Sequence, residues 1–254
     1  MLRAALGEPG LTYLGYSYGT RIGTAYLARF PENVRAMVLD GAVDPDRDTA
    51  DVLVAQACPL GPDPARRFQD LLAPLADTPA PADGERLLGL AGGGGSTLLT
   101  LADVYHDRQA DGTYTNAADV LTAVGCVDDA RTEPARAAET AARVRAAAPF
   151  LDDGNPPSAA RGTCAFWPVP AAEPLAATRV GAPPAVVVST TGDPATPYEA
   201  GVRLAERLGA RLVTVQGEQH TAVFSGIACL DRPVLDYLVD PRRLPPADLR
   251  CAAG

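Results

Sequence analysis

The chain contains no lysine, no long apolar run and only two histidines. No window approaches the roughly 18 uninterrupted apolar residues of a membrane-spanning helix. The segment Met1–Gly7 is too short for a signal peptide. The net charge of −9 argues against a nucleic-acid-binding protein, and nothing in the sequence resembles a basic stripe. We therefore expect neither a membrane nor a nucleic acid as partner. We interpret the absence of lysine as the compositional bias of a GC-rich genome, without functional meaning.

Five cysteines are more than a cytosolic enzyme of this size usually contains. None forms a Cys-x-x-Cys pair, so we expect no zinc site, and no other metal or cofactor is predicted. Cys229 and Cys251 bracket the last predicted helix and the tail, whereas Cys126 and Cys164 bracket a helix and loop in the middle. Two disulfides with Cys58 left over are the preferred interpretation, and five buried free thiols are the alternative. Disulfides would indicate an oxidising compartment.

A Gly-x-Ser-x-Gly motif, Gly15 to Gly19, lies between an apolar run and a helical segment. Leu11–Leu14 predicts a strand and Thr20–Phe30 a helix, which is the order of a nucleophile elbow. Such a turn places a serine at a helix N-terminus, and glycine costs least at the flanking positions. We predict Ser17 as the nucleophile and the Tyr18 backbone N–H as one oxyanion donor. A glycine-rich turn that merely contains a serine is the alternative.

Apolar β-branched runs predict four strands of a parallel sheet, because the first two enclose a helix. These strands are expected at Leu11–Leu14, Val34–Leu39, Ala185–Ser189 and Arg211–Val215. Helices are expected after the last two strands, at Tyr198–Leu208 and at about Ile227–Leu238.

The segment 46–183 differs in character, since helical patterns alternate there with proline- and glycine-rich joints. Helices are expected at Ala65–Leu75, Gly84–Leu90, Ser96–His106, Asn116–Cys126 and Glu133–Ala148. The glycine run Gly92–Gly95 lacks the Lys-Ser/Thr and the preceding strand of a phosphate loop, and predicts a flexible hinge. We expect a helical cap, 46–183, inserted into a core formed by 1–45 and 184–254.

A nucleophilic serine needs a base and an acid. His220 follows the last predicted strand, at the sheet edge where Ser17 is expected, whereas His106 lies beside charged residues and is expected at the surface. Asp193 follows the preceding strand and gives the chain order Ser, Asp, His of an α/β-hydrolase. Asp40, at the end of the second strand, is the rival acid. In this hypothesis Ser17 attacks a carbonyl, His220 transfers the proton and Asp193 orients the histidine.

Several short segments carry a family resemblance. They are Gly15–Thr20, Phe30–Arg35, Val38–Pro45, Thr191–Pro197, Gln219–Thr221, Cys229–Leu238, Leu244–Pro246 and Cys251. Together they resemble the secreted tripeptidyl aminopeptidases of actinobacteria, which are α/β-hydrolases related to prolyl aminopeptidases. The resemblance implies an extracellular peptidase that releases short peptides from the N-terminus of a polypeptide. It also implies a disulfide-tied C-terminal end and a helical cap that restricts entry to chain ends.

The chain differs from that family ahead of Leu11. In the family the elbow strand is central, and several strands and a glycine-rich oxyanion loop precede it. We therefore expect an α/β fold with a partial α/β-hydrolase core, the C-terminal half of a parallel sheet with flanking helices, plus the cap. The remaining strands could come from another polypeptide. Loss of one oxyanion donor typically costs ~10²–10³ in rate, so little peptidase activity is expected of the isolated chain.

Two alternatives to the exopeptidase stay open. An esterase acting on small acyl substrates uses the same acyl-enzyme chemistry. A non-catalytic fragment that serves as an interaction module is the other. An acidic site that binds a free amino terminus would favour the peptidase, with Asp103, Asp107 and Asp111 as candidates, although a solvated charged face is the competing interpretation.

Overall fold

A computed structural model describes residues 2–44, 49–57, 103–104, 106–129, 131–148, 162–172 and 184–253. The chain divides into two compact units, one formed by Met1–Pro59 with Pro174–Gly254 and the other by Leu60–Glu173. The helices predicted at 65–75 and 84–90, most of the one at 96–106, and Cys58 lie outside the described residues.

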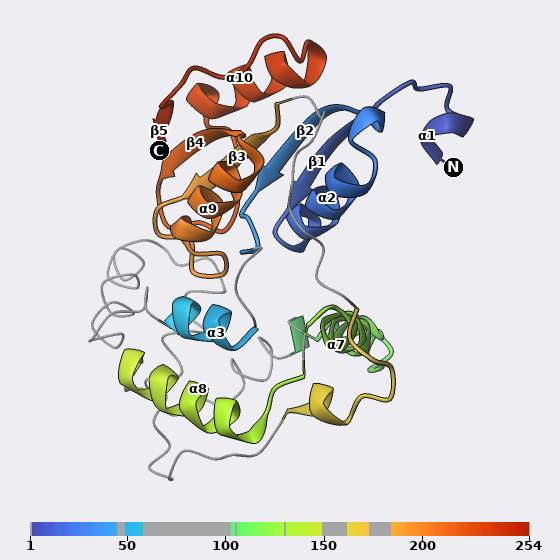
Figure 1. Ribbon diagram of the computed structural model, residues 1–254, viewed down its shortest axis with the longest axis vertical. Coiled ribbons are helices and arrows are strands. Elements are labelled where there is room, and N and C mark those ends of the chain that lie inside the picture. The colour runs from blue at the N-terminus through green and yellow to red at the C-terminus, as the bar shows by residue number, and fades with distance from the viewer. Residues whose placement is uncertain are drawn as a thin grey trace. The chain divides into compact units, whose positions relative to one another are not determined.

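The first unit contains a parallel sheet with the order β1-β2-β3-β4-β5 in the described part of the chain (Figure 1). The strands are β1 (Leu11–Tyr16), β2 (Val34–Asp40), β3 (Val186–Thr190), β4 (Arg211–Gln216) and β5 (Arg250–Ala252). The predicted parallel α/β sheet is confirmed, and four of its strands lie where the apolar runs indicate. The strand β5 was not predicted, because three residues after a proline-rich stretch are too few to show a strand period.

The helices of this unit are α1 (Leu2–Ala5), α2 (Tyr18–Arg29), the 3₁₀ turn η1 (Pro31–Asn33), α3 (Thr49–Ala57), α9 (Tyr198–Leu208) and α10 (Ala228–Val239). The segment of α3 falls within the predicted cap, but its residues belong to the same compact unit as the sheet. One reason is a hydrogen bond from Gln56 Nε2 to Ala195 O, at 2.7 Å.

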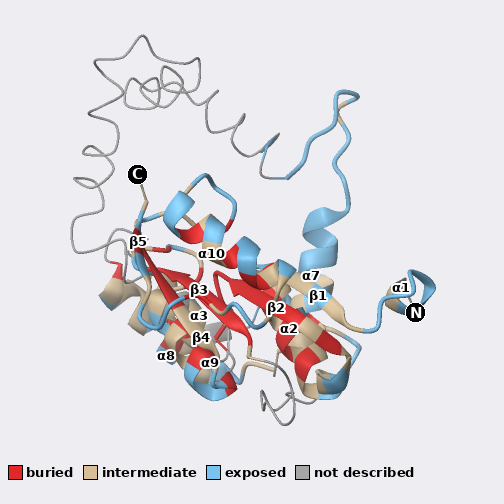
Figure 2. Ribbon diagram, turned by 90° about the horizontal axis from the view of Figure 1, so that it is seen from above, coloured by how far each residue is buried: buried red, intermediate tan, exposed pale blue. Residues whose placement is uncertain are grey.

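The two faces of the sheet are covered by different helices (Figures 1 and 2). Successive side chains of a strand point to opposite faces. Along β2, Met37 and Leu39 therefore pack with residues of α2 and α9, whereas Val38 packs with Leu230 and Val234 of α10. Both sides of the central strands are buried, which explains why they appear in the sequence as continuous apolar runs.

Gly23 lets α2 approach the sheet closely. A Cβ atom on Gly23 would lie 2.7 Å from Leu39 Cδ2 and 2.8 Å from Tyr13 Cε1, so a larger residue would push the helix away.

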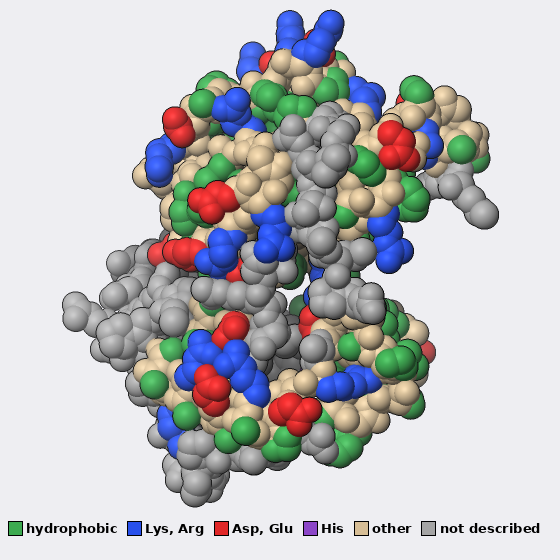
Figure 3. Space-filling model, in the orientation of Figure 1, with side chains coloured by type: hydrophobic (Ala, Val, Ile, Leu, Met, Phe, Trp, Pro, Cys, Tyr) green, Lys and Arg blue, Asp and Glu red, His purple; other side chains and the backbone are tan. Residues whose placement is uncertain are grey.

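The second unit contains α7 (Ala117–Asp128), α8 (Pro134–Ala147) and the 3₁₀ turn η4 (Thr163–Phe166). A disulfide joins Cys126 of α7 to Cys164 of η4. The Arg131 guanidinium reinforces this link, because it donates hydrogen bonds to the carbonyls of both cysteines and of Trp167. The side of α8 that faces the viewer in Figure 3 carries both signs of charge. The helix includes an Arg136–Glu139 pair at 2.9 Å.

A second disulfide, Cys229–Cys251, joins the start of α10 to β5 in the first unit. Both cysteine pairs favoured by the sequence analysis are thus bonded. Across the described residues, no helix combines the length and apolarity needed to cross a membrane.

The Cys229–Cys251 disulfide should contribute to stability because it closes a loop with a sequence separation of 22. The chain-entropy relation gives about 3 kcal/mol for a loop of this size. We expect the C229S/C251S variant to lose about that much free energy of unfolding in urea titrations. A reducing agent should lower the stability of C229S/C251S less than that of the wild type, because only the wild type retains this bond. Equal denaturation midpoints for the oxidised wild type and C229S/C251S would contradict the prediction.

Candidate active site

Ser17 lies at the turn between β1 and α2 in a backbone conformation that non-glycine residues rarely adopt, with φ 52° and ψ −120°. Hydrogen bonds hold the turn from both sides. Ser17 N donates to Asp40 O at 2.9 Å, and Thr20 Oγ1 donates to Ser17 O at 2.7 Å. Thr20 Oγ1 also accepts from Val43 N, at 2.9 Å. The strained conformation is therefore fixed by its surroundings, as a nucleophile elbow requires.

The two glycines of the motif have different structural reasons. A Cβ atom on Gly15 would lie 2.6 Å from Gly19 O and 2.6 Å from Tyr13 Cε1, so only glycine fits there. A Cβ atom on Gly19 would meet Tyr13 Oη at 3.4 Å, which is ordinary contact. Tyr18 begins α2, so its backbone N–H belongs to the N-terminal turn of the helix, where negative charge is favoured.

The structure brings His220 and Asp193 into direct contact. His220 Nδ1 lies 2.9 Å from Asp193 Oδ2 and 3.0 Å from Oδ1. The Asp193 side chain is fully buried, whereas the His220 side chain is 32% exposed. A carboxylate on Nδ1 favours the tautomer in which Nε2 of the neutral ring accepts a proton.

Thr196 completes the environment of this carboxylate and was missed in the sequence analysis. Asp193 Oδ1 accepts hydrogen bonds from Ala195 N at 2.8 Å and Thr196 N at 2.9 Å, and Thr196 Oγ1 donates to Oδ2 at 2.7 Å. An aspartate that accepts from backbone groups two and three residues later is ordinary turn chemistry, so the Asp-Pro-Ala-Thr sequence contained the signal.

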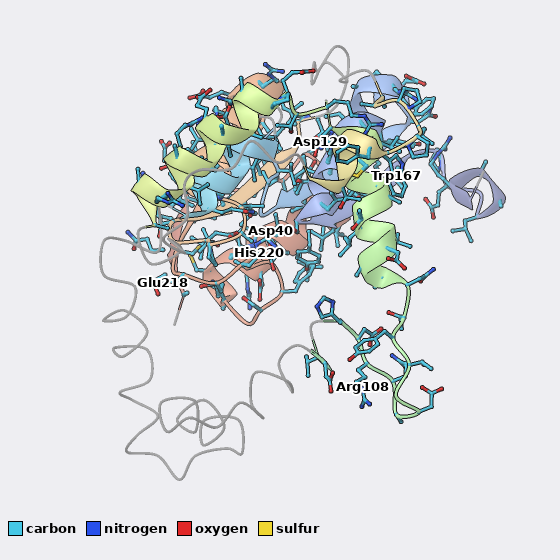
Figure 4. The ribbon with its side chains drawn as sticks, turned by 90° about the horizontal axis from the view of Figure 1, so that it is seen from below. Asp40, Arg108, Asp129, Trp167, Glu218 and His220 are labelled. Carbon is cyan, nitrogen blue, oxygen red and sulfur yellow. A yellow bond between two sulfur atoms is a disulfide. The ribbon has the colours of Figure 1, made fainter. Side chains whose placement is uncertain are left out.

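Asp40, the rival acid, contacts the histidine loop at a different place. Its Oδ2 accepts hydrogen bonds from Ala222 N at 2.7 Å and Val223 N at 2.8 Å. Asp40 and His220 lie close together (Figure 4), and electrostatic interaction couples their charges. Burial is the main cause that raises the pKa of Asp40, and the two backbone hydrogen bonds oppose it.

A cavity of about 200 Å³ lies beside Ser17 in the first unit. Small apolar side chains from α3, from the chain after β2 and from the Asp193 loop form much of its wall; they include Ala42, Val43, Val52, Ala55 and Ala195. Arg203 and Asp44 form a polar part of the wall, with Arg203 Nε 2.9 Å from Asp44 Oδ2. The cavity can therefore accept a small apolar group next to the serine.

The other predicted residues lie in the second unit. His106 is exposed, and its ring meets Tyr114 edge-on with centroids 6.5 Å apart. Asp103 accepts a hydrogen bond from Tyr114 Oη, and Asp111 accepts two from Thr113. Among the described residues, no cluster of three or more His, Cys, Asp or Glu side chains could hold a metal ion.

Comparison with known proteins finds similarity along nearly the whole chain. Residues 154–251 match the family Abhydrolase_4, described as TAP-like protein. The chain is 40% identical to the serine protease Hip1 of Mycobacterium tuberculosis, over 98% of this chain and 59% of that protein. It is 44% identical to the carboxylesterase B of Mycobacterium tuberculosis, over 89% of this chain and 54% of that protein. It is 30% identical to the tripeptidyl aminopeptidase of Streptomyces lividans, over 94% of this chain and 53% of that protein.

The chain thus spans between half and three-fifths of the length of these curated relatives. The parallel sheet with its flanking helices is the architecture of an α/β-hydrolase core. Together with the similarities, it identifies this chain as a member of the α/β-hydrolase superfamily, in which residues 154–251 match the TAP-like family.

Proposed function

We propose that this protein is a serine peptidase that releases short peptides from the N-terminus of polypeptides, with Ser17, His220 and Asp193 as its catalytic residues. The contact between His220 Nδ1 and the buried Asp193 carboxylate, in a unit that also holds a serine on a strained turn, carries the proposal. These three residues follow β1, β3 and β4, so all lie at the carboxyl edge of one parallel sheet, where α/β proteins bind ligands.

The chemistry follows from these positions. Ser17 Oγ attacks the scissile carbonyl carbon while His220 Nε2 takes the hydroxyl proton. The Tyr18 backbone N–H, at the start of α2, stabilises the oxyanion of the tetrahedral intermediate. Collapse of this intermediate breaks the C–N bond, and His220 gives its proton to the leaving amine. Water then attacks the acyl-enzyme by the same route and restores Ser17. Throughout, Asp193 stays ionised and stabilises the imidazolium.

The names of two relatives, a serine protease and a tripeptidyl aminopeptidase, support a peptide substrate. The name of a third, carboxylesterase B, keeps an esterase as the second candidate.

Within the proposal the cavity beside Ser17 takes a small apolar group of the substrate, and the helical segment 46–183 limits access to chain ends. The two disulfides favour an extracellular location. β1 forms one edge of the described sheet, where a strand of a further polypeptide could pair.

A fluorophosphonate probe tests the proposed nucleophile directly. We expect covalent labelling at Ser17, located by peptide mass spectrometry, and complete loss of labelling in Ser17→Ala. His220→Ala should slow labelling roughly 10²–10⁴-fold, because the base that activates the hydroxyl is removed. Circular dichroism should show that all samples are folded. A folded wild-type protein that does not react would favour the non-catalytic alternative.

Substrate assays separate the two enzymatic candidates. A peptidase should hydrolyse a tripeptide anilide, which has a free amino terminus, faster than its N-acetylated form, whereas an esterase should hydrolyse only activated esters. The expectation of low turnover by the 254-residue chain stays a prediction, and rapid hydrolysis of the tripeptide anilide would contradict it.

Thr196 should support the reaction through Asp193. Thr196→Val removes the Oγ1 donor but keeps the shape, so it should slow acylation of Ser17 by roughly 10- to 100-fold, the range for a lost hydrogen bond to a charged group. Thr196→Ser retains the hydroxyl and should recover most of the rate. Similar rates for wild type and Thr196→Val, measured with the same probe, would show that this contact does not matter.

A further inference from the structure

The loop that carries His220 is held to the sheet by side chains that the proposed reaction does not use. Two amides of the loop, Ala222 N and Val223 N, donate to Asp40 Oδ2. The carbonyl of Val223 accepts a hydrogen bond from Tyr16 Oη at 2.9 Å. Farther along the loop, Asp231 of α10 accepts from Phe224 N at 2.7 Å and Gly226 N at 3.0 Å. The loop includes Thr221 and Phe224 at positive φ, so it needs such anchors to keep its shape.

Asp40 joins the histidine loop to the serine turn. Its main-chain oxygen accepts the hydrogen bond from Ser17 N, while its side chain accepts those of Ala222 and Val223. The next residue, Gly41, has φ 66°, and a Cβ atom there would lie 3.2 Å from His220 Cε1. The ring of His220 therefore lies against the backbone at the end of β2, beside Asp40.

A carboxylate is a costly choice for this anchor. Asp40 is completely buried, and within the described residues its Oδ1 has no hydrogen-bond partner. Burial, the largest cause, and the nearby Asp193 raise the pKa of Asp40. When folding raises the pKa of an acid, the free energy of unfolding falls as the pH rises above the ordinary pKa of that acid, here 3.8. A contribution to stability at neutral pH therefore does not explain the charge, whereas an effect on His220 does.

We propose that Asp40 is a second acidic positioning residue of the site, which holds the histidine loop through Ala222 and Val223 and whose negative charge stabilises the protonated form of His220. Asp193 orients the ring from Nδ1, and Asp40 fixes the backbone that carries the ring. The groups facing this region are Asp193 from the β3–α9 loop, Tyr16 from β1 and Asp231 from α10. The effect of Asp40 on acylation rests on the proposed function, whereas its effects on the loop and on the charge of His220 do not.

The two histidines make a direct measurement possible. In His106→Gln protein the remaining imidazole signal in an NMR pH titration belongs to His220. Asp40→Asn keeps an oxygen acceptor for both amides but removes the charge. We expect the titration midpoint of the His220 ring protons to move to lower pH in this variant, because a nearby negative charge favours the protonated ring.

Asp231→Asn is the matched control, because Asp231 also accepts two amides of the same loop. It should leave the midpoint of His220 in place. Asp40→Ala removes the anchor as well as the charge, so it should also speed hydrogen exchange at Ala222 and Val223, which Asp40→Asn should preserve. Equal His220 midpoints in wild type and Asp40→Asn would overturn the proposal, as would an equal shift in Asp231→Asn.

Stability and acylation give two further readouts. The melting temperature of Asp40→Asn relative to wild type should rise as pH increases from about 4 to 7, since only the wild type must ionise a buried acid. The low-pH limb of fluorophosphonate labelling should move to lower pH in Asp40→Asn by the same amount as the His220 midpoint. If the His220 midpoint moves as expected in Asp40→Asn but the probe never labels the wild type, the peptidase proposal fails and the role of Asp40 stands. If it labels but the midpoint does not move, only the role of Asp40 fails.

Discussion

The hydrogen bond from Ser17 N to Asp40 O is the contact on which the arrangement of the site depends. It forms because β1 and β2 are parallel and in register to their last residues, with Tyr16 opposite Asp40. The bond fixes where β1 ends and α2 begins, and so keeps Ser17 in its strained conformation. The same register places the Asp40 side chain under the histidine loop. One pairing between two strands therefore determines the positions of Ser17 and of the loop that carries His220.

The residues of the candidate site lie at one edge of the sheet. Val187 and Val213 are completely buried in the middle of their strands, whereas Ser17, Asp193 and His220 follow the carboxyl ends of β1, β3 and β4. Parallel strands require crossovers, so these ends are also where loops must turn into helices. Short turns such as Asp193 to Thr196 satisfy their own carboxylate with backbone amides before a helix begins. A buried acid can thus be held beside a histidine by backbone amides of its own turn.

Strand and helix positions in the core could be predicted because strong local patterns agree with the tertiary structure there. The continuous β-branched run before Ser189 and the αL glycine Gly209 that ends α9 are examples. The motif positions also placed Asp193 and His220 after two successive strands at one sheet edge, and the two side chains are in contact. What could not be predicted depends on long-range pairing. Three such contacts join residues distant in sequence, and none leaves a periodic signal. They are the pairing of β5 with β4, the hydrogen bond from Tyr16 to Val223, and the hydrogen bonds from Ala222 and Val223 to Asp40.

The short strand β5 has a consequence for the histidine. Gln216, the last residue before the histidine loop, is opposite Ala252, and Cys229, just after the loop, is bonded to Cys251. Two adjacent residues of β5 therefore clamp both ends of the segment that carries His220. Closing a loop costs entropy, and in this protein the strand pairing and the disulfide close the segment within the folded chain itself. The position of His220 therefore depends on residues some thirty positions away from it, so the redox state of one disulfide influences the conformation of the loop that carries this histidine.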